Sequence, residues 1–210
     1  DEVGDIVQHA LKYKCVRGVT FQPVQDAGRN DGFNKKKNRV LLTDVRRELA
    51  KSSGIFSQDD LIPLPCSPEN ICIGYGIRSG DQVAPITSFF PPEVLSAAVP
   101  NTVTFENFPQ LRTEMFNLLS LSTTAADASE KLASVLCCLP QAQVPETLSY
   151  EDTFRVVIVQ FMDAHNFCVG GVKRSCIHFV EPDGKIYPFD TFNLFYRDKS
   201  VVKRLREKVI

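Results

Sequence analysis

Apolar positions recur at helical spacing at the start of the chain and at strand-like spacing soon after. Val3, Val7 and Leu11 share one face of a helix, which predicts a helix over the first eleven residues. Residues 16–24 are rich in β-branched side chains and reach a proline near their end, which predicts a strand. A helix joined to a strand by a short connection is half of an α/β repeat. Half a repeat cannot bury both of its faces, so we expect partner elements upstream in the whole protein.

The rest of the chain mixes helical and strand periods. It predicts, in order, a polar linker over 28–39, a helix over 43–52, a hairpin of 73–77 with 83–89, helices between 91 and 138, a buried strand over 155–162, a hairpin of 176–180 with 185–189 around the turn 181–184, and a closing helix over 201–209.

Composition narrows the protein class. The 210 residues are 43% hydrophobic, as in a globular protein, and carry 24 basic against 25 acidic side chains. This balance gives no electrostatic footprint for nucleic acid, and the basic run around Lys36 is typical of a solvated loop. No apolar stretch is long enough to span a bilayer, and no signal peptide opens the chain. We therefore expect a cytoplasmic protein.

Seven cysteines are present, an odd number for a disulfide scaffold. In a reducing compartment they are either buried apolar residues or metal ligands. Cys66 and Cys72 lie in a loop stiffened by prolines, which lowers the entropy cost of presenting two thiolates to one metal or cluster. The alternative is two half-buried thiols in an ordinary loop.

The other cysteines are less distinctive. Cys176 and His178 share one face of a strand, where they could serve as a ligand and its hydrogen-bonding neighbour or as core residues. Cys168, close to two glycines, is a ligand or a bystander. Phosphate-binding and dinucleotide-binding glycine motifs are absent. The polar segment 163–166 follows the predicted buried strand, a common place for site residues and for plain turns.

An ordered set of short motifs resembles the C-terminal half of the radical S-adenosylmethionine (SAM) proteins that include archaeal tetraether lipid synthase and related bacterial enzymes. The resemblance covers essentially the whole chain and rests on residues 19–24, 63–66, 161–167, 176–179, 182–184 and 188–197.

The resemblance implies an α/β fold, in which the end of a partial (β/α) barrel precedes an α+β auxiliary iron–sulfur domain. Residues 1–40 would hold the last helix and strand of the barrel plus a linker, and residues 41–210 the auxiliary-cluster domain. The implied cofactors are an auxiliary [4Fe–4S] cluster and, through an N-terminal barrel, SAM. The implied partners are that barrel and a reductant such as ferredoxin or flavodoxin.

The family chemistry is hydrogen abstraction from an unactivated carbon by a 5′-deoxyadenosyl radical, in an oxidoreductase or a transferase, with a lipid as one expected substrate. The Cys-x-x-x-Cys-x-x-Cys motif of the radical cluster is missing from this chain. We therefore expect this portion alone not to cleave SAM.

The resemblance also implies site residues. Cys66, Cys72 and Cys176 match the cluster ligands, and either Asp190 or Cys168 would fill the fourth position. Gln22 and Pro23 match a barrel strand end that would contact SAM or substrate, although the same residues can simply end the strand. Two other hypotheses stay open: an iron–sulfur electron-transfer or metal-binding module without catalysis of its own, and a structural domain whose cysteines pack in the core.

Overall fold

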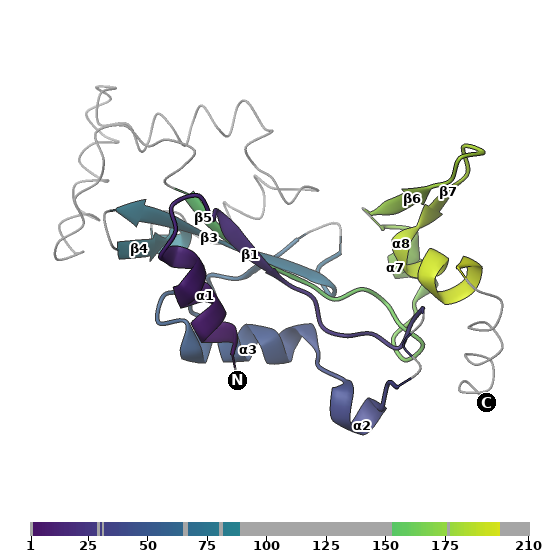
Figure 1. Cartoon of the computed structure of the whole chain (residues 1–210), viewed down its shortest axis with the longest axis horizontal. Coiled ribbons are helices and arrows are strands. Elements are labelled where there is room, and N and C mark those ends of the chain that lie inside the picture. Colours follow the sequence, from purple (N-terminus) through teal and green to yellow (C-terminus); the bar gives the residue numbers. More distant parts are fainter. Residues whose placement is uncertain are drawn as a thin grey trace.

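Runs of β-branched and other apolar residues form a five-stranded sheet at the centre of the molecule (Figure 1). The computed structural model describes residues 2–28, 30, 32–64, 67–79, 82–88, 153–175 and 177–197. The strand order is β1-β5-β3-β2, and β4 pairs with the far end of β3. The strands are β1 (Gly18–Phe21), β2 (Ile62–Pro63), β3 (Ile71–Ser79), β4 (Gln82–Pro85) and β5 (Thr153–Val159).

The sheet is mixed. β1 and β5 run parallel, with Gly18 opposite Arg155 and Phe21 opposite Ile158. β3 runs antiparallel to β5, β2 and β4. The strand predicted over 16–24 is confirmed in a shorter form, and the buried strand predicted over 155–162 is confirmed as β5. From Val156 to Val159 β5 is apolar and buried on both faces, as is typical of a strand in the interior of a sheet.

Two helices, α1 (Val3–Leu11) and α3 (Leu42–Ser52), confirm the predicted helices and cover one face of the sheet (Figure 1). They approach so closely that a Cβ atom on Gly4 would overlap the carbonyl of Ser52. The core between helices and sheet consists of Val7, Ala10, Leu42, Val45, Leu49, Phe56, Leu61, Cys72, Phe154, Val156 and Ile158.

The predicted linker over 28–39 is partly wrong, because it contains a one-turn helix, α2 (Lys35–Asn38). Asn34 starts this helix: its Oδ1 accepts a hydrogen bond of 3.0 Å from the amide of Lys36. A short 3₁₀ helix, η1 (Ile86–Ser88), follows β4. The helices predicted between 91 and 138 and over 201–209 lie outside the described residues.

A smaller C-terminal part packs at the end of the sheet where β1 and β5 finish (Figure 1). Its hairpin confirms the predicted pair of strands and the turn before Lys185, where Gly184 has a φ of +83°. Aromatic rings pack together within it, among them the tilted pair Phe179 and Phe192 with centroids 4.5 Å apart. Its elements are α7 (Val169–Val172), β6 (His178–Val180), β7 (Ile186–Pro188), α8 (Phe189–Thr191) and the π-helical turn η4 (Phe192–Tyr196).

The predicted domain boundary at residue 40 crosses one continuous sheet, since β1 pairs with β5 and α1 packs on α3. The barrel end and the auxiliary iron–sulfur domain stay predictions. Among the described helices, none combines the length and the apolar character that crossing a membrane requires.

Candidate functional site

Two polar loops meet at one edge of the sheet. Residues 22–28 follow β1 and residues 160–168 follow β5. Because β1 and β5 are parallel neighbours, both loops leave the sheet at the same edge. In α/β proteins this carboxyl edge of parallel strands is where ligands usually bind.

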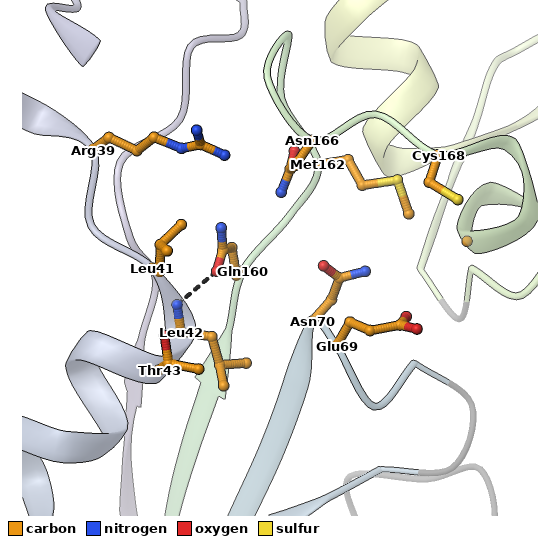
Figure 2. A pocket seen from close by; sticks show the side chains of 11 residues that line it. Arg39, Leu41, Leu42, Thr43, Glu69, Asn70, Gln160, Met162, Asn166 and Cys168 are labelled. Atoms are coloured by element: carbon orange, nitrogen blue, oxygen red, sulfur yellow. Dashed lines mark hydrogen bonds between the residues drawn. The ribbon is translucent and has the colours of Figure 1, made fainter. Parts of the chain in front are cut away.

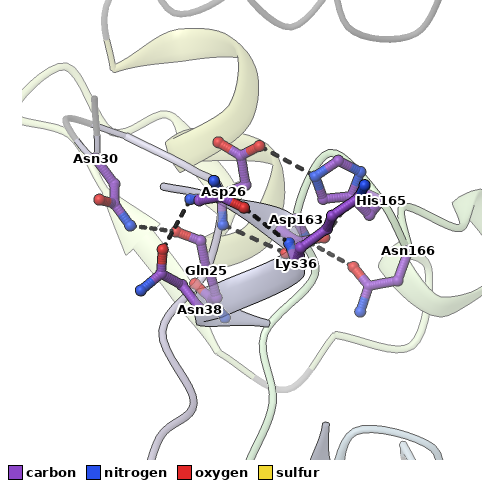
Figure 3. A network of polar contacts seen from close by, with 9 residues as sticks. Gln25, Asp26, Asn30, Lys36, Asn38, Asp163, His165 and Asn166 are labelled. Carbon is purple, nitrogen blue, oxygen red and sulfur yellow. Dashed lines mark hydrogen bonds and ion pairs between the residues drawn. The ribbon is translucent and has the colours of Figure 1, made fainter. Parts of the chain in front are cut away.

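A network of buried side chains joins the two loops (Figure 3). The amide of Asp26 donates to Oδ2 of Asp163 at 3.3 Å, and the amide of His165 donates to Oδ1 of the same carboxylate at 2.8 Å. The imidazole Nε2 of His165 lies 3.1 Å from Oδ2 of Asp26. One carboxylate therefore receives a donor from each loop, and the His165–Asp26 contact joins the loops a second time.

The side chains of this junction are largely shielded from solvent, unlike those of a surface turn. The side chains of His165 and Asp26 are 16% and 8% exposed, and Asp163 is buried as well. The ring of Phe33 stacks on His165 with centroids 6.2 Å apart. The contact between the imidazole and the carboxylate of Asp26 therefore fixes the position of His165 at the junction.

A pocket of about 370 Å³ opens beside the same loop, between the start of α3 and the start of β3 (Figure 2). This volume lies in the usual range for small-molecule sites. The pocket combines apolar walls with polar groups and is lined by Arg39, Leu41, Leu42, Thr43, Glu69, Asn70, Gln160, Met162, Asn166, Cys168 and Gly171.

The predicted cysteine ligands lie in different environments. Cys72, on β3, is fully buried in the core against the helices. Burial raises the pKa of its thiol from 9.0 to about 11, although the charge of Arg46 and the backbone at Ile158 lower it. A cluster binds the thiolate, so this environment favours a packing role for Cys72. Cys168 is exposed and lines the 370 Å³ pocket instead.

Asp190 lines a smaller, neighbouring cavity of about 20 Å³, which is also lined by Ser67, Ser175 and Ile177. Its Oδ1 accepts a hydrogen bond of 2.5 Å from the amide of Met162. Burial raises the pKa of this carboxyl group, while the Met162 amide lowers it.

The described residues alone do not fit an iron–sulfur cluster. They contain no group of three or more His, Cys, Asp or Glu side chains that could hold a metal. Cys66 and Cys176 lie outside the described residues. Each is joined by one peptide bond to a residue that lines the Asp190 cavity, Ser67 in one case and Ser175 and Ile177 in the other.

Gln22 and Pro23 follow β1 directly and begin the loop that leads to Asp26. Gln22 is exposed and Pro23 is half-buried. Their predicted contact with SAM or substrate stays a prediction.

Sequence reasoning identified part of this site. The polar segment 163–166 was visible as a segment after a buried strand, but Asp26 and Gln160 carried no motif. Arg39 belonged to a basic run interpreted as a solvated loop. The missing signal was the parallel pairing of β1 with β5, which joins segments more than a hundred residues apart.

No protein-family model matches the chain. A comparison with curated proteins shows similarity to the 7,8-dihydro-6-hydroxymethylpterin dimethyltransferase of Methanocaldococcus jannaschii, with 23% identity over 95% of this chain. The chain spans about half of that relative, 46% of its length. The similarity supports a relation to an enzyme, and it supports the relation to radical SAM proteins that the motifs indicate. It does not support a specific relation to tetraether lipid synthase.

Proposed function

We propose that this chain is the C-terminal portion of a radical SAM enzyme that transfers methyl groups to a heteroaromatic, pterin-like substrate. The observation that carries the proposal is the junction of two polar loops at the carboxyl ends of β1 and β5, next to a pocket of about 370 Å³. The similarity to a pterin dimethyltransferase over nearly the whole chain supports the reaction class.

In this proposal, a cluster in an N-terminal barrel, reduced by a protein such as ferredoxin or flavodoxin, would cleave one SAM to methionine and a 5′-deoxyadenosyl radical that takes a hydrogen atom from the substrate. A second SAM would give its methyl group to the substrate and leave as S-adenosylhomocysteine, with the reductant supplying the second electron. The residues of this chain bind and orient the substrate. His165 contacts Asp26, and Asp163 fixes the two loops at the spacing that this contact needs. Gln22 and Pro23, at the end of β1, would contact SAM or the substrate.

An auxiliary cluster remains part of the proposal, with Cys66, Cys176 and Asp190 as its ligands. Its support is that the chain neighbours of both cysteines line the cavity of Asp190. Cys72 is left out of the ligand set, because its thiol packs in the core.

The first test is activity in the full-length protein, purified without oxygen and supplied with SAM, a reductant and 6-hydroxymethyl-7,8-dihydropterin. We expect 5′-deoxyadenosine and a methylated pterin in mass spectrometry. Asp26→Asn weakens the contact with His165 that joins the two loops and should lower the rate about tenfold, the effect of losing about one hydrogen bond to a charged group. Iron-loaded protein that forms no 5′-deoxyadenosine would overturn the proposal in favour of an electron-transfer module.

Substrate choice is tested in the same assay. Methylated pterin in the absence of any coupled lipid product supports the pterin-like substrate. Carbon–carbon coupling of a lipid chain, with no change in the pterin, would contradict it and restore the lipid expectation.

The second test separates the cysteines. We expect Cys66→Ser and Cys176→Ser to lower the iron content of the auxiliary cluster, since each removes a thiolate. Cys72→Ser is the matched control: it should keep the iron and only lower the melting temperature. Loss of iron in Cys72→Ser, in a variant that still folds, would contradict the assignment.

A further inference from the structure

Two carboxamide groups in the 370 Å³ pocket are held in one orientation by the backbone. Oε1 of Gln160 accepts a hydrogen bond of 2.6 Å from the amide of Leu42, at the start of α3 (Figure 2). A backbone N–H can only donate, so the atom facing it must be the carboxamide oxygen. The NH₂ group of Gln160 therefore occupies the other branch of the side chain.

Asn166 is fixed in the same way. Its Oδ1 accepts a hydrogen bond of 2.6 Å from the amide of Asp163. Within the described part of the chain, no hydrogen bond uses either NH₂ group or the guanidinium of Arg39. All three side chains line the pocket, and Figure 2 shows them projecting into the same space. The pocket therefore presents several donors at once.

The other side of the pocket is suited to packing against a flat ring of a ligand. Leu41, Leu42 and Met162 provide apolar surface. Asn70 donates through Nδ2 to the hydroxyl of Ser67 at 3.1 Å, so its oxygen is the group available as an acceptor. A flat ligand that packs on apolar side chains and carries acceptors along one edge would satisfy both features.

The charges in the pocket are of both signs. Arg39 lines it together with Glu69, whose carboxylate lies 3.5 Å from the guanidinium of Arg174. A neutral ligand rich in acceptors can bind the donors and, unlike an anion, is not repelled by the carboxylate of Glu69.

We propose that this pocket binds a neutral, bicyclic heteroaromatic ligand whose ring nitrogens and carbonyl oxygen accept hydrogen bonds from Gln160, Asn166 and Arg39. The inference deepens the proposed function and rests on it for the identity of the site as a substrate site. Binding itself requires neither SAM nor a cluster, so it is measured separately from turnover.

The test is a titration of 6-hydroxymethylpterin into the full-length protein, followed by the fluorescence anisotropy of the pterin. The chain contributes no tryptophan emission, because it has no Trp. Gln160→Glu and Asn166→Asp each keep the oxygen that accepts from the backbone but replace the NH₂ donor by an acceptor. We expect each to weaken binding about tenfold or more, the effect of a lost hydrogen bond facing an unpaired acceptor.

Gln58→Glu is the control, since it makes the same chemical change on an exposed side chain outside the pocket and should leave the affinity unchanged. Equal melting temperatures of the variants would show that the fold is intact. Unchanged pterin affinity in both pocket variants would overturn the inference, and so would displacement of the pterin by inorganic phosphate at similar concentration.

The outcomes also separate the two proposals. If the pterin binds and both substitutions weaken its binding, but no turnover occurs, the pocket assignment is supported and the proposed function is contradicted. If turnover occurs and neither substitution changes binding, the proposed function is supported and the pocket assignment is contradicted.

Discussion

The helix-covered face of the sheet and the loop junction at its carboxyl edge are both buried, but they are buried in different ways. The face contains apolar side chains such as Phe154 and Leu49, which gain stability from contact with almost any neighbour of the right size. The junction contains Asp26 and Asp163, which are tolerated only because directed hydrogen bonds satisfy them. The core therefore specifies the fold, while the junction specifies positions of individual atoms, as a site requires.

One charged residue in the core clarifies the contrast. Arg78 is buried on β3, with its guanidinium 5.1 Å from the ring centroid of Phe154. It donates to the carbonyl of Tyr13 at 3.2 Å and to that of Val16 at 2.5 Å, in the connection from α1 to β1. Burial lowers the pKa of this guanidinium, and the neighbouring charge of Arg17 lowers it further. Arg78 thus has a structural role, because its partners are backbone carbonyls of the scaffold.

The largest effect should come from the core. Phe154→Ala removes a fully buried ring between the sheet and the helices, and the resulting cavity should cost about 3–5 kcal/mol of the free energy of unfolding. Urea denaturation followed by circular dichroism measures this loss. Val180→Ala is the control, because Val180 is 69% exposed and should show little change. Equal losses in both variants would contradict the assignment of this face as the core.

The junction should respond to smaller changes. Asp163→Ala leaves the amides of Asp26 and His165 without their acceptor and should cost about 1–3 kcal/mol, the usual penalty for unsatisfied buried donors. Asp163→Asn keeps one oxygen and should lie between the wild type and Asp163→Ala in urea denaturation. The rise in its activation free energy should exceed its loss in the free energy of unfolding, because the two loops would shift relative to each other. An Asn variant as stable and active as the wild type would remove the positioning role of Asp163.

The same contrast explains what the sequence could predict. The helices of the core face and the strand β5 follow from local periodicity, and the turn at Gly184 follows from residues that adjoin each other. The parallel pairing of β1 with β5 does not, since a hydrophobic pattern records burial and not the neighbouring strand. Prediction of the site is limited in the same way. His165 was visible beside a buried strand, whereas its partner Asp26 became recognisable only when the pairing brought the two loops together.

Two cysteines allow the burial of the core to be compared with that of the pocket. Cys72 is fully buried and Cys168 is exposed, so iodoacetamide at pH 8 should label Cys168 in the folded protein and leave Cys72 unlabelled until the protein unfolds. Peptide mass spectrometry distinguishes the two sites. Rapid labelling of Cys72 in the folded protein would contradict its place in the core.

The pH dependence of stability gives an independent check on Cys72. Its pKa is about 11 in the folded protein against 9.0 when unperturbed, so the unfolded thiol ionises first as the pH rises. The contribution of Cys72 to stability is therefore complete below pH 9 and is lost as the pH approaches 11. At pH 10 the wild type should have lost on the order of 1 kcal/mol that Cys72→Ala does not lose, since the folded and unfolded pKa values of the thiol differ. The stability difference between the two proteins should accordingly shrink between pH 8 and pH 10 in urea denaturation. A constant difference over this range would mean that the thiol titrates in the fold as it does in water, and Cys72 would again be a candidate ligand.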